Sequence, residues 1–389
     1  MSADRRMRIA VVGRLDEGDS ADGVATALTN LVQALSERAH IDLEVWQPSE
    51  VSEVTERSVG GIPVFDIPSL GSSSILRGLP RATEHWLQQR RDRVDLLHLH
   101  SVFIPDHVWI ARRARKPYVI TPHGGYLPDV RSGNHRVVKS LWMRSYEGRF
   151  VDGAAGLHAV SQNEGVELAR FRPHATIDVI PNGVEAGADL GHPGSAWDSS
   201  PKRFLYLGRL AVVHKGIDLL IRGFAQLVDA GVDARLVIAG PDFRGGRAVL
   251  EQLIAANSIA SHVEFMGPVY GEAKARLLAG SVALVSPSRW DGMPLNVLEA
   301  LAAGCPPIIT PHTNLGDEVR AASAGLVVDA DPSSIAEGLH QLLALSAEDY
   351  ELMRKRGLEL VRQHFTWSSA AGHLEDVYAS ALARNARAA

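Results

Sequence analysis

Short apolar runs alternate with amphipathic helical patterns along almost the whole of this 389-residue chain. Such an alternation is typical of a parallel β-sheet whose strands are joined by crossover helices, so we predict an α/β fold. A helix is expected over 25–36. The expected strands are residues 8–12, 41–46, 96–100, 118–121, 156–160, 176–180, 203–207, 235–239, 263–265, 282–285, 307–310 and 325–328.

The length of the chain favours two domains, because it exceeds the usual size of a single hydrophobic core. Each half of the chain carries half of the expected strands and has the pattern of a Rossmann-like unit. Residues 185–202 are rich in Gly, Ala, Ser and Pro without clear periodicity, which favours an interdomain linker. We therefore expect an N-terminal domain over 1–184 and a C-terminal domain over 203–365.

Composition and charge indicate a soluble enzyme that acts on a small molecule. The chain is 46% hydrophobic and 22% charged, and its net charge of −5 argues against a dedicated nucleic-acid binder. The first residues lack the apolar core of a signal peptide, and no stretch reaches about 18 uninterrupted apolar residues. We expect a cytoplasmic protein. The single Cys305 is expected to be a small buried filler rather than a reactive thiol.

The segment 286–310, SPSRWDGMPLNVLEALAAGCPPIIT, places Asp291 and Glu299 on either side of a turn that opens a helix. Pro294 suits the first turn of that helix, and the free backbone N–H groups after it would face an anion such as a phosphate. Asp291 would face whatever hangs from the phosphate, and Glu299 could accept hydrogen bonds from ribose hydroxyls. This pattern predicts a nucleotide-sugar site. The three N–H groups belong to Leu295, Asn296 and Val297.

Two cations follow the first expected strand of the C-terminal half. Gly208 and Arg209 come directly after residues 203–207, and Lys215 stands six positions further on. The guanidinium fork of Arg209 and the point charge of Lys215 can grip a diphosphate and neutralise it without a metal ion. A plain surface role is the alternative for each cation.

Glycines and one histidine follow strands of the N-terminal half. Gly13, Gly18 and Gly23 do not fit the G-x-G-x-x-G spacing of a dinucleotide site, so they are turn residues or points of close approach to a ligand. Pro-His-Gly-Gly-Tyr follows residues 118–121, and His123 would project toward a ligand there. A structural histidine is the alternative.

His98 and His100 share one face of an expected strand. A pair of histidines two positions apart can bind a metal ion, but no third ligand nearby completes a recognisable set. We therefore expect no metal site.

Taken together, these motifs resemble the retaining glycosyltransferases of family 4 over nearly the whole chain. The resemblance implies a GT-B fold, with two facing Rossmann-like domains, a cleft between them, and a C-terminal helix over 366–386 that packs back on the first domain. Trp367, Leu374 and Tyr378 would then be packing residues. The implied activity moves a hexosyl group from a nucleotide-diphosphate sugar to an acceptor hydroxyl, in the synthesis of a cell-surface glycan or glycolipid.

The resemblance also assigns roles to individual residues. Arg209 and Lys215 would bind the donor diphosphate, Asp291 would contact the donor sugar in place of the family's glutamate, and Glu299 would contact the ribose. His123 would lie near the transferred sugar. Further donor contacts are expected from Gly13, Gly208, Gly292, Met293, Pro294, Leu295, Asn296 and Val297, nucleobase contacts from Pro268, Val269 and Tyr270, and acceptor contacts from Asp22, Gly23 and Gly124.

A basic window in the N-terminal half suggests how an acceptor is reached. Residues 77–149 carry a net charge of +8 in an otherwise acidic chain, and 131–149 mix Trp142 and Tyr146 with Arg and Lys. Such a segment could lie on an anionic membrane surface or receive a lipid-linked acceptor, with solvated helix faces as the alternative.

Two other functions stay open on the sequence. A sugar-nucleotide epimerase also uses two Rossmann domains, and Asp291 in the place of a glutamate could mark a sugar-nucleotide-binding protein without catalysis.

Overall fold

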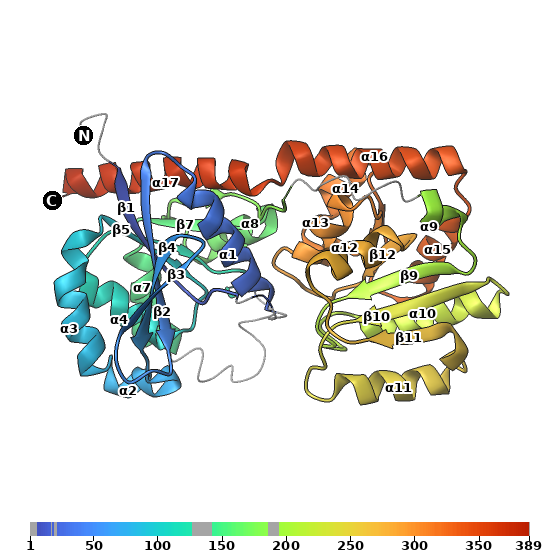
Figure 1. Ribbon diagram of the computed structural model, residues 1–389, viewed down its shortest axis with the longest axis horizontal. Coiled ribbons are helices and arrows are strands. Elements are labelled where there is room, and N and C mark those ends of the chain that lie inside the picture. Colours follow the sequence, from blue (N-terminus) through green and yellow to red (C-terminus); the bar gives the residue numbers. More distant parts are fainter. Residues whose placement is uncertain (1–5, 17, 19–21, 127–141, 186–193, 389) are drawn as a thin grey trace. The chain divides into compact units, whose positions relative to one another are not determined.

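The computed structural model describes residues 6–16, 18, 22–126, 142–185 and 194–388 (Figure 1). The chain divides into two compact units. The first comprises Met1–Asn182 together with Trp367–Ala389, and the second comprises Gly183–Thr366. Each unit is built on one sheet of mainly parallel strands, which confirms the predicted α/β fold.

The first unit has an eight-stranded sheet in the order β3-β4-β2-β1-β5-β6-β7-β8. Every pairing is parallel except that of β3 with β4. The strands are β1 (Met7–Val12), β2 (Ile41–Ser49), β3 (Thr55–Val59), β4 (Ile62–Pro68), β5 (Leu96–His100), β6 (Tyr118–Thr121), β7 (Gly156–Ala159) and β8 (Ile177–Val179).

Helices cover both faces of this sheet. α1 joins β1 to β2, whereas α4 joins β5 to β6 in the opposite direction along the sheet, so right-handed crossovers place the two helices on opposite faces. The helices are α1 (Gly23–Ser36), α2 (Ser74–Arg77), α3 (Arg81–Arg90), α4 (Pro105–Ala114), α7 (Gly148–Asp152), α8 (Gln162–Phe171) and α17 (Trp367–Ala388), with short turns η1 (Gly71–Ser73), η2 (Arg91–Arg93) and the π-helix η3 (Met143–Glu147).

The antiparallel hairpin of β3 and β4 was not expected. β3 is mostly exposed and has no apolar run, whereas β4 is largely buried but contains Pro63 and Pro68, which are unfavourable in a strand. Gly60 and Gly61 both adopt positive φ in the turn between them, a conformation that glycine reaches without strain.

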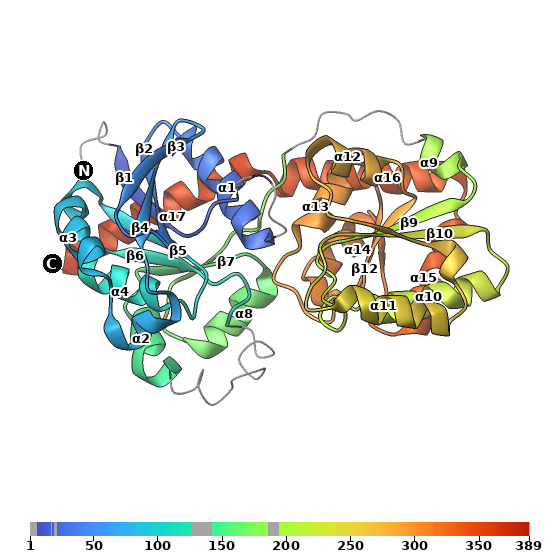
Figure 2. The ribbon, with the colours of Figure 1, turned by 60° about the horizontal axis from the view of Figure 1, so that its bottom comes forward.

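The second unit has a six-stranded sheet in the order β11-β10-β9-β12-β13-β14, and all of its strands are parallel (Figure 2). Its strands are β9 (Lys202–Leu207), β10 (Ala234–Ala239), β11 (Val263–Met266), β12 (Ala283–Ser286), β13 (Pro307–Ile309) and β14 (Leu326–Val327). Its helices are α9 (Gly194–Asp198), α10 (Ile217–Asp229), α11 (Gly246–Ala256), α12 (Gly271–Ala279), α13 (Leu295–Ala302), α14 (Gly316–Ala322), α15 (Pro332–Leu343) and α16 (Ala347–His364), with short turns η4 (Ala260–His262) and η5 (Pro311–Thr313).

The described part of the expected linker 185–202 is structured. Residues 194–198 form α9, and Trp197 stacks on Tyr350 with ring centroids 4.3 Å apart. The Gly, Ser and Pro content suggested an unpacked segment, but the one aromatic residue in it provides enough apolar surface to join the second unit. Cys305 is buried in the same unit, where burial raises the pKa of its thiol to about 12, as expected for a filler.

The C-terminal helix α17 packs along α1 in the first unit, and the two views show the helices side by side (Figures 1 and 2). Trp367, Leu374 and Tyr378 are buried. Among the described residues, no helix is both long and apolar enough to cross a lipid bilayer.

A buried chain of hydrogen bonds ties Tyr378 to the sheet. Its hydroxyl lies 2.6 Å from Nδ1 of His98, whose Nε2 lies 2.7 Å from the hydroxyl of Thr121. That hydroxyl in turn lies 2.7 Å from Nδ1 of His158, whose Nε2 lies 2.8 Å from the carbonyl oxygen of Ile180.

The carbonyl of Ile180 fixes the direction of the whole chain, because a carbonyl oxygen can only accept. His158 must therefore donate through Nε2 and accept at Nδ1 from Thr121, and Thr121 must accept from Nε2 of His98. Tyr378 then donates to Nδ1 of His98. Every member is satisfied while both imidazoles are neutral, and burial lowers the pKa of His98 well below its usual value and that of His158 to about 4.

These neutral histidines predict that the first unit loses stability in mild acid. An unfolded histidine has a pKa of about 6.5, so below that pH the unfolded chain binds protons that the folded chain excludes. Between pH 7 and pH 5, a histidine whose folded pKa is about 4 should lower the free energy of unfolding by about 2 kcal/mol. Buried Glu164 has a pKa raised to about 7, so the folded chain binds a proton there as the pH falls, which raises the free energy of unfolding. This gain offsets only part of the loss that the buried histidines cause together.

Urea unfolding at pH 5, 6 and 7 would measure this loss for the unaltered protein and for His158→Gln. The variant should lose about 2 kcal/mol less than the unaltered protein between pH 7 and pH 5. His85→Gln is the control, since His85 is exposed on α3. An unchanged pH dependence in His158→Gln would contradict the neutral, buried state of His158.

Candidate active site

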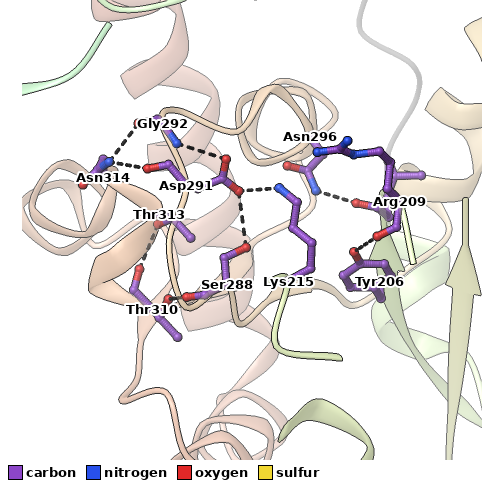
Figure 3. Close-up of polar contacts among 11 residues, drawn as sticks. Tyr206, Arg209, Lys215, Ser288, Asp291, Gly292, Asn296, Thr310, Thr313 and Asn314 are labelled. Atoms are coloured by element: carbon purple, nitrogen blue, oxygen red, sulfur yellow. Dashed lines mark hydrogen bonds and ion pairs between the residues drawn. The ribbon is translucent and has the colours of Figure 1, made fainter. Parts of the chain in front are cut away.

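The order of strands in the second unit reverses beside β9, because β10 lies on one side of it and β12 on the other. In open parallel sheets, ligands bind at such a reversal, outside the carboxyl ends of the strands. The loops 208–216 and 287–294 leave the carboxyl ends of β9 and β12 and meet there (Figure 3). The expected diphosphate and sugar contacts come from these two loops.

Glycines allow the backbone to pack tightly at this edge. Gly240, at the end of β10, has φ +145°, and a Cβ atom there would lie 2.0 Å from the carbonyl oxygen of Gly208. Gly216 has φ +65° and is packed equally tightly, since a Cβ atom there would lie 2.0 Å from the carbonyl oxygen of Pro287. A larger residue at Gly216 would push the loops 208–216 and 287–294 apart, and one at Gly240 would displace Gly208.

Asp291 and Lys215 form an ion pair across the two loops (Figure 3). Nζ of Lys215 lies 2.5 Å from Oδ2 of Asp291, and the two side chains are only 16% and 14% exposed. Ser288 donates to the same oxygen at 3.3 Å, and the N–H of Gly292 donates to Oδ1 at 3.1 Å. The carboxylate of Asp291 is therefore held on several sides.

Asparagine side chains fix the loop that joins Asp291 to α13. Nδ2 of Asn314 donates to the carbonyl oxygens of Asp291 and Gly292, at 2.6 and 2.9 Å. Nδ2 of Asn296 donates to the carbonyl oxygen of Leu207 at 2.6 Å, which ties the start of α13 to the end of β9 (Figure 3). The sequence interpretation missed Asn314, which lies after β13, and considered only the backbone of Asn296.

The start of α13 differs from the expectation in one detail. Pro294 is the N-cap residue with extended ψ, not the first helical residue, and the N–H of Val297 donates to its carbonyl oxygen at 3.2 Å. The N–H of Val297 is therefore not free. The N–H groups of Leu295 and Asn296 stay at the open first turn, where the helix dipole favours an anion.

Glu299 is paired with a lysine that the sequence interpretation did not select. Nζ of Lys274 in α12 lies 2.6 Å from Oε1 of Glu299, and both side chains are about one quarter exposed. The residues expected at the nucleobase, Pro268, Val269 and Tyr270, lie between β11 and α12, the helix that carries Lys274.

Arg209 lies against an aromatic ring rather than a carboxylate. Its guanidinium carbon is 5.1 Å from the ring centroid of Phe243, and its carbonyl oxygen accepts the hydroxyl of Tyr206 at 2.8 Å. No carboxylate of the described residues forms an ion pair with Arg209. Its charge is therefore available to an anionic ligand.

A second set of contacts holds the two loops from outside. Arg289 binds both carboxylate oxygens of Asp218 at 2.8 Å, and its N–H donates to the carbonyl oxygen of His214 at 3.0 Å. The ring of His214 stacks on Trp290 at 4.7 Å, and burial together with Lys215 lowers the pKa of His214 to about 4. These contacts position the neighbours, Lys215 and Asp291.

In the first unit, His123 lies in a tight turn after β6. Nε2 of His123 is 3.0 Å from Nδ1 of His100, and a Cβ atom on Gly13 would lie 3.4 Å from Cβ of His100. Gly13, His100 and His123 therefore gather at the carboxyl ends of β1, β5 and β6. His98 lies on the same face of β5 but belongs to the buried chain of Tyr378, so its nitrogens are already used.

The acceptor candidates of this unit have structural contacts. The carboxylate of Asp22 accepts the N–H of Val24 as the N-cap of α1, and Gly23 is the first residue of that helix. The N–H of Gly124 donates to Glu164 at 2.5 Å. Among the described residues, no group of three or more His, Cys, Asp or Glu side chains is arranged to hold a metal ion.

The expected membrane segment 131–149 is described only from residue 142. Trp142 is buried and donates through Nε1 to Glu147 at 2.6 Å, and Tyr146 stacks on Trp142 at 4.8 Å. Trp142 is therefore not the surface-facing residue that the pattern suggested, whereas Tyr146 is only partly buried. Residues 131–141 lie outside the described part.

Sequence profiles of two glycosyltransferase families match the chain. The profile "Glycosyltransferase Family 4" matches residues 21–187, and "Glycosyl transferases group 1" matches residues 191–359. The chain belongs to glycosyltransferase family 4. This assignment favours the transferase over the epimerase that the sequence left open.

Curated relatives of this family 4 glycosyltransferase share about a quarter of its residues. The GDP-mannose:cellobiosyl-diphosphopolyprenol alpha-mannosyltransferase of Xanthomonas oryzae pv. oryzae is 27% identical over 74% of each chain. The phosphatidyl-myo-inositol mannosyltransferase of Mycobacterium tuberculosis is 24% identical over 95% of this chain and 96% of its own. Sucrose-phosphate synthase of Thermosynechococcus elongatus, 21% identical, has the same fold with a TM-score of 0.80 over 97% of this chain and 100% of its own.

Proposed function

We propose that this glycosyltransferase moves a mannosyl group from GDP-mannose to a lipid-linked acceptor, with retention at the anomeric carbon. The observation that carries the proposal is the ion pair of Lys215 with Asp291 at the strand reversal of the second unit. In this proposal the cation of Lys215 would bind a diphosphate, and the carboxylate of Asp291 beside it would orient a sugar. The name of the Xanthomonas relative gives GDP-mannose as its donor, and both relatives are by their names mannosyltransferases that act on lipid-linked or lipid acceptors.

In the proposed reaction, the bond between the anomeric carbon and the diphosphate oxygen breaks while a bond to the acceptor oxygen forms on the same face. Negative charge grows on the departing GDP. Arg209, Lys215 and the first turn of α13 would stabilise that charge, and the acceptor proton would pass to an oxygen of the leaving diphosphate. Removing one such fixed contact typically costs about 10²- to 10³-fold in rate.

The donor residues have assigned tasks in this proposal. Asp291 would orient the sugar and Glu299 the ribose, with Lys274 holding the carboxylate of Glu299 in place. Gly208 and Gly292 would let the backbone approach the donor closely, and Met293 would contribute a backbone contact. We expect donor binding without a metal ion, because two cations and a helix N-terminus can neutralise the diphosphate.

Thermal stabilisation by GDP, UDP and ADP, with and without EDTA, tests the donor site. A nucleotide at about 100 times its dissociation constant should raise the free energy of unfolding by roughly 2.7 kcal/mol. We expect GDP to stabilise the unaltered protein equally with and without EDTA, and Glu299→Ala to lose the effect.

Glu337→Ala is the matched control, since Glu337 is exposed on α15 of the same unit. Stabilisation by none of the three nucleotides would contradict the proposed site. Stabilisation by UDP or ADP alone would still support a nucleotide site in the second unit, but it would overturn the choice of GDP-mannose as the donor. Transfer is then measured with GDP-mannose and either cellobiosyl-diphosphopolyprenol or phosphatidylinositol, and loss of donor without a glycosylated acceptor would indicate a binding protein or a hydrolase.

We further propose that the enzyme works at the surface of an anionic membrane, reached through the cations of 77–149. The net charge of +8 in this window supports an electrostatic contact, and each cation near such a surface is worth about 1 kcal/mol. The protein should sediment with vesicles that contain phosphatidylglycerol and should stay in solution with vesicles of phosphatidylcholine alone.

Charge reversal at Arg136, Lys139 and Arg144 should weaken this sedimentation strongly. The control reverses Arg222, Arg356 and Arg362, three exposed cations of the second unit. Equal loss in both variants would point to net charge rather than to this segment, and no sedimentation of the unaltered protein would end the membrane proposal.

A further inference from the structure

The turn that carries His123 has a backbone conformation that a histidine rarely adopts. His123 and Gly124 have φ values of +52° and +77°, and the N–H of Gly125 donates to the carbonyl oxygen of Pro122 at 3.0 Å. A residue other than glycine in this region costs about 1 kcal/mol or more, so the turn persists only where its surroundings hold it. A Cβ atom on Gly125 would lie 2.3 Å from Cγ2 of Val102, so the turn is also packed tightly.

Glu164 fixes the backbone of the His123 turn. It lies in the first turn of α8 and is 1% exposed, and its two carboxylate oxygens accept two backbone N–H groups. Oε1 accepts from Gly124 at 2.5 Å, and Oε2 accepts from Val160 at 2.8 Å. One carboxylate therefore joins the His123 turn after β6 to the end of β7.

The sequence around Glu164 explains why this side chain is unusual. Ser161 and Glu164 have the S-x-x-E spacing of a capping box, in which the glutamate normally returns to the N–H of the capping serine. Ser161 does cap α8, since its side chain accepts the N–H of Glu164 at 3.2 Å. The glutamate does not complete the box, because its carboxylate binds Gly124 and Val160 instead.

The ring of His123 is held from the other side by His100, whose Nδ1 lies 3.0 Å from its Nε2. His100 is 2% exposed, and its own Nε2 has no hydrogen-bond partner in the described part of the chain. A buried orphan N–H is costlier than a buried orphan lone pair, so we expect His100 to donate through Nδ1. His123 then accepts at Nε2 and carries its proton on Nδ1.

We propose that Glu164 is a positioning residue of the transferase, which fixes the backbone of the His123 turn so that the His123 ring meets the transferred sugar in one orientation. This inference rests on the proposed function, in which His123 contacts that sugar. Glu164 acts through Gly124 and need not touch the substrate. Its removal should therefore lower the rate of transfer and leave nucleotide affinity in the second unit unchanged.

The experiment follows the contact and the rate separately. His123-Gly124 is the only His-Gly pair in the sequence, so labelling the protein with ¹³C-carbonyl histidine and ¹⁵N-glycine gives a single correlation from the Gly124 amide. Its proton shift reports the hydrogen bond to Glu164 whether or not the enzyme turns over. The rate is measured as GDP release from GDP-mannose with the lipid-linked acceptor, and affinity is measured by titration with GDP.

We expect Glu164→Gln to move the Gly124 correlation and to lower kcat about 10-fold, since the amide can accept only one of the two N–H groups. Glu164→Ala should lower kcat about 10²-fold, as misplacement of a group by about 1 Å can do. GDP affinity should stay unchanged in both variants, which also shows that the second unit is folded. Glu167→Gln is the matched control, because Glu167 lies on the same helix and pairs with exposed Arg170.

An unmoved correlation in Glu164→Ala, which removes both carboxylate oxygens, would overturn the contact, and a moved correlation with unchanged kcat would overturn the positioning role. Equal losses in Glu164→Gln and Glu167→Gln would assign the effect to the helix as a whole and overturn the proposal as well. Absence of transfer by the unaltered protein would count against the proposed function, while the correlation would still decide the contact.

Discussion

The ion pair between Lys215 and Asp291 joins two loops that are 76 residues apart in the sequence and meet only because β9 and β12 are neighbours in a parallel sheet. In the site that we propose, the placement of the Asp291 carboxylate for the donor sugar depends on this pair. A cation and a carboxylate at 2.5 Å, each largely buried, keep both loops in a defined geometry before any ligand arrives. Fixed charges of this kind need no reorganisation during the reaction, which is where enzymes gain most of their electrostatic stabilisation.

In each unit, side chains bind backbone carbonyl or N–H groups at strand ends and so hold the loops that carry candidate residues. Asn314 and Asn296 hold the loop of Asp291 through carbonyl oxygens, and Glu164 holds the turn of His123 through N–H groups. These contacts fix the backbone and do not have to touch a ligand. They determine the orientation of the side chains that would contact the donor or take part in the reaction.

The sequence predicted most of the strands, because the pattern of a buried strand is local, whereas the roles given to the site motifs stay predictions. Buried parallel strands are continuous apolar runs, and the residues after them are placed by the topology. It failed where the deciding contact is long-range or the apolar signal is weak. The pairing of Lys274 with Glu299 joins two different helices, so the sequence does not show it. β3 has no apolar run, and β4 contains two prolines. The pattern around Trp142 suggested a membrane-facing residue, but Trp142 is buried and its N–H donates to Glu147. The sequence allows Pro294 to be either the N-cap or the first residue of α13, and only the backbone conformation shows that it is the N-cap.

The most direct test of the account compares GDP affinity with mannosyl transfer in Asp291→Asn. Asparagine can still accept the N–H of Gly292, but it removes the charge that holds Lys215. The account predicts that GDP binds at least as tightly as to the unaltered protein, because Lys215 is released to the diphosphate, while transfer from GDP-mannose falls about 10²-fold or more. Parallel loss of GDP affinity and transfer would show that the pair only maintains the fold, and unchanged transfer would show that Asp291 takes no part in the reaction.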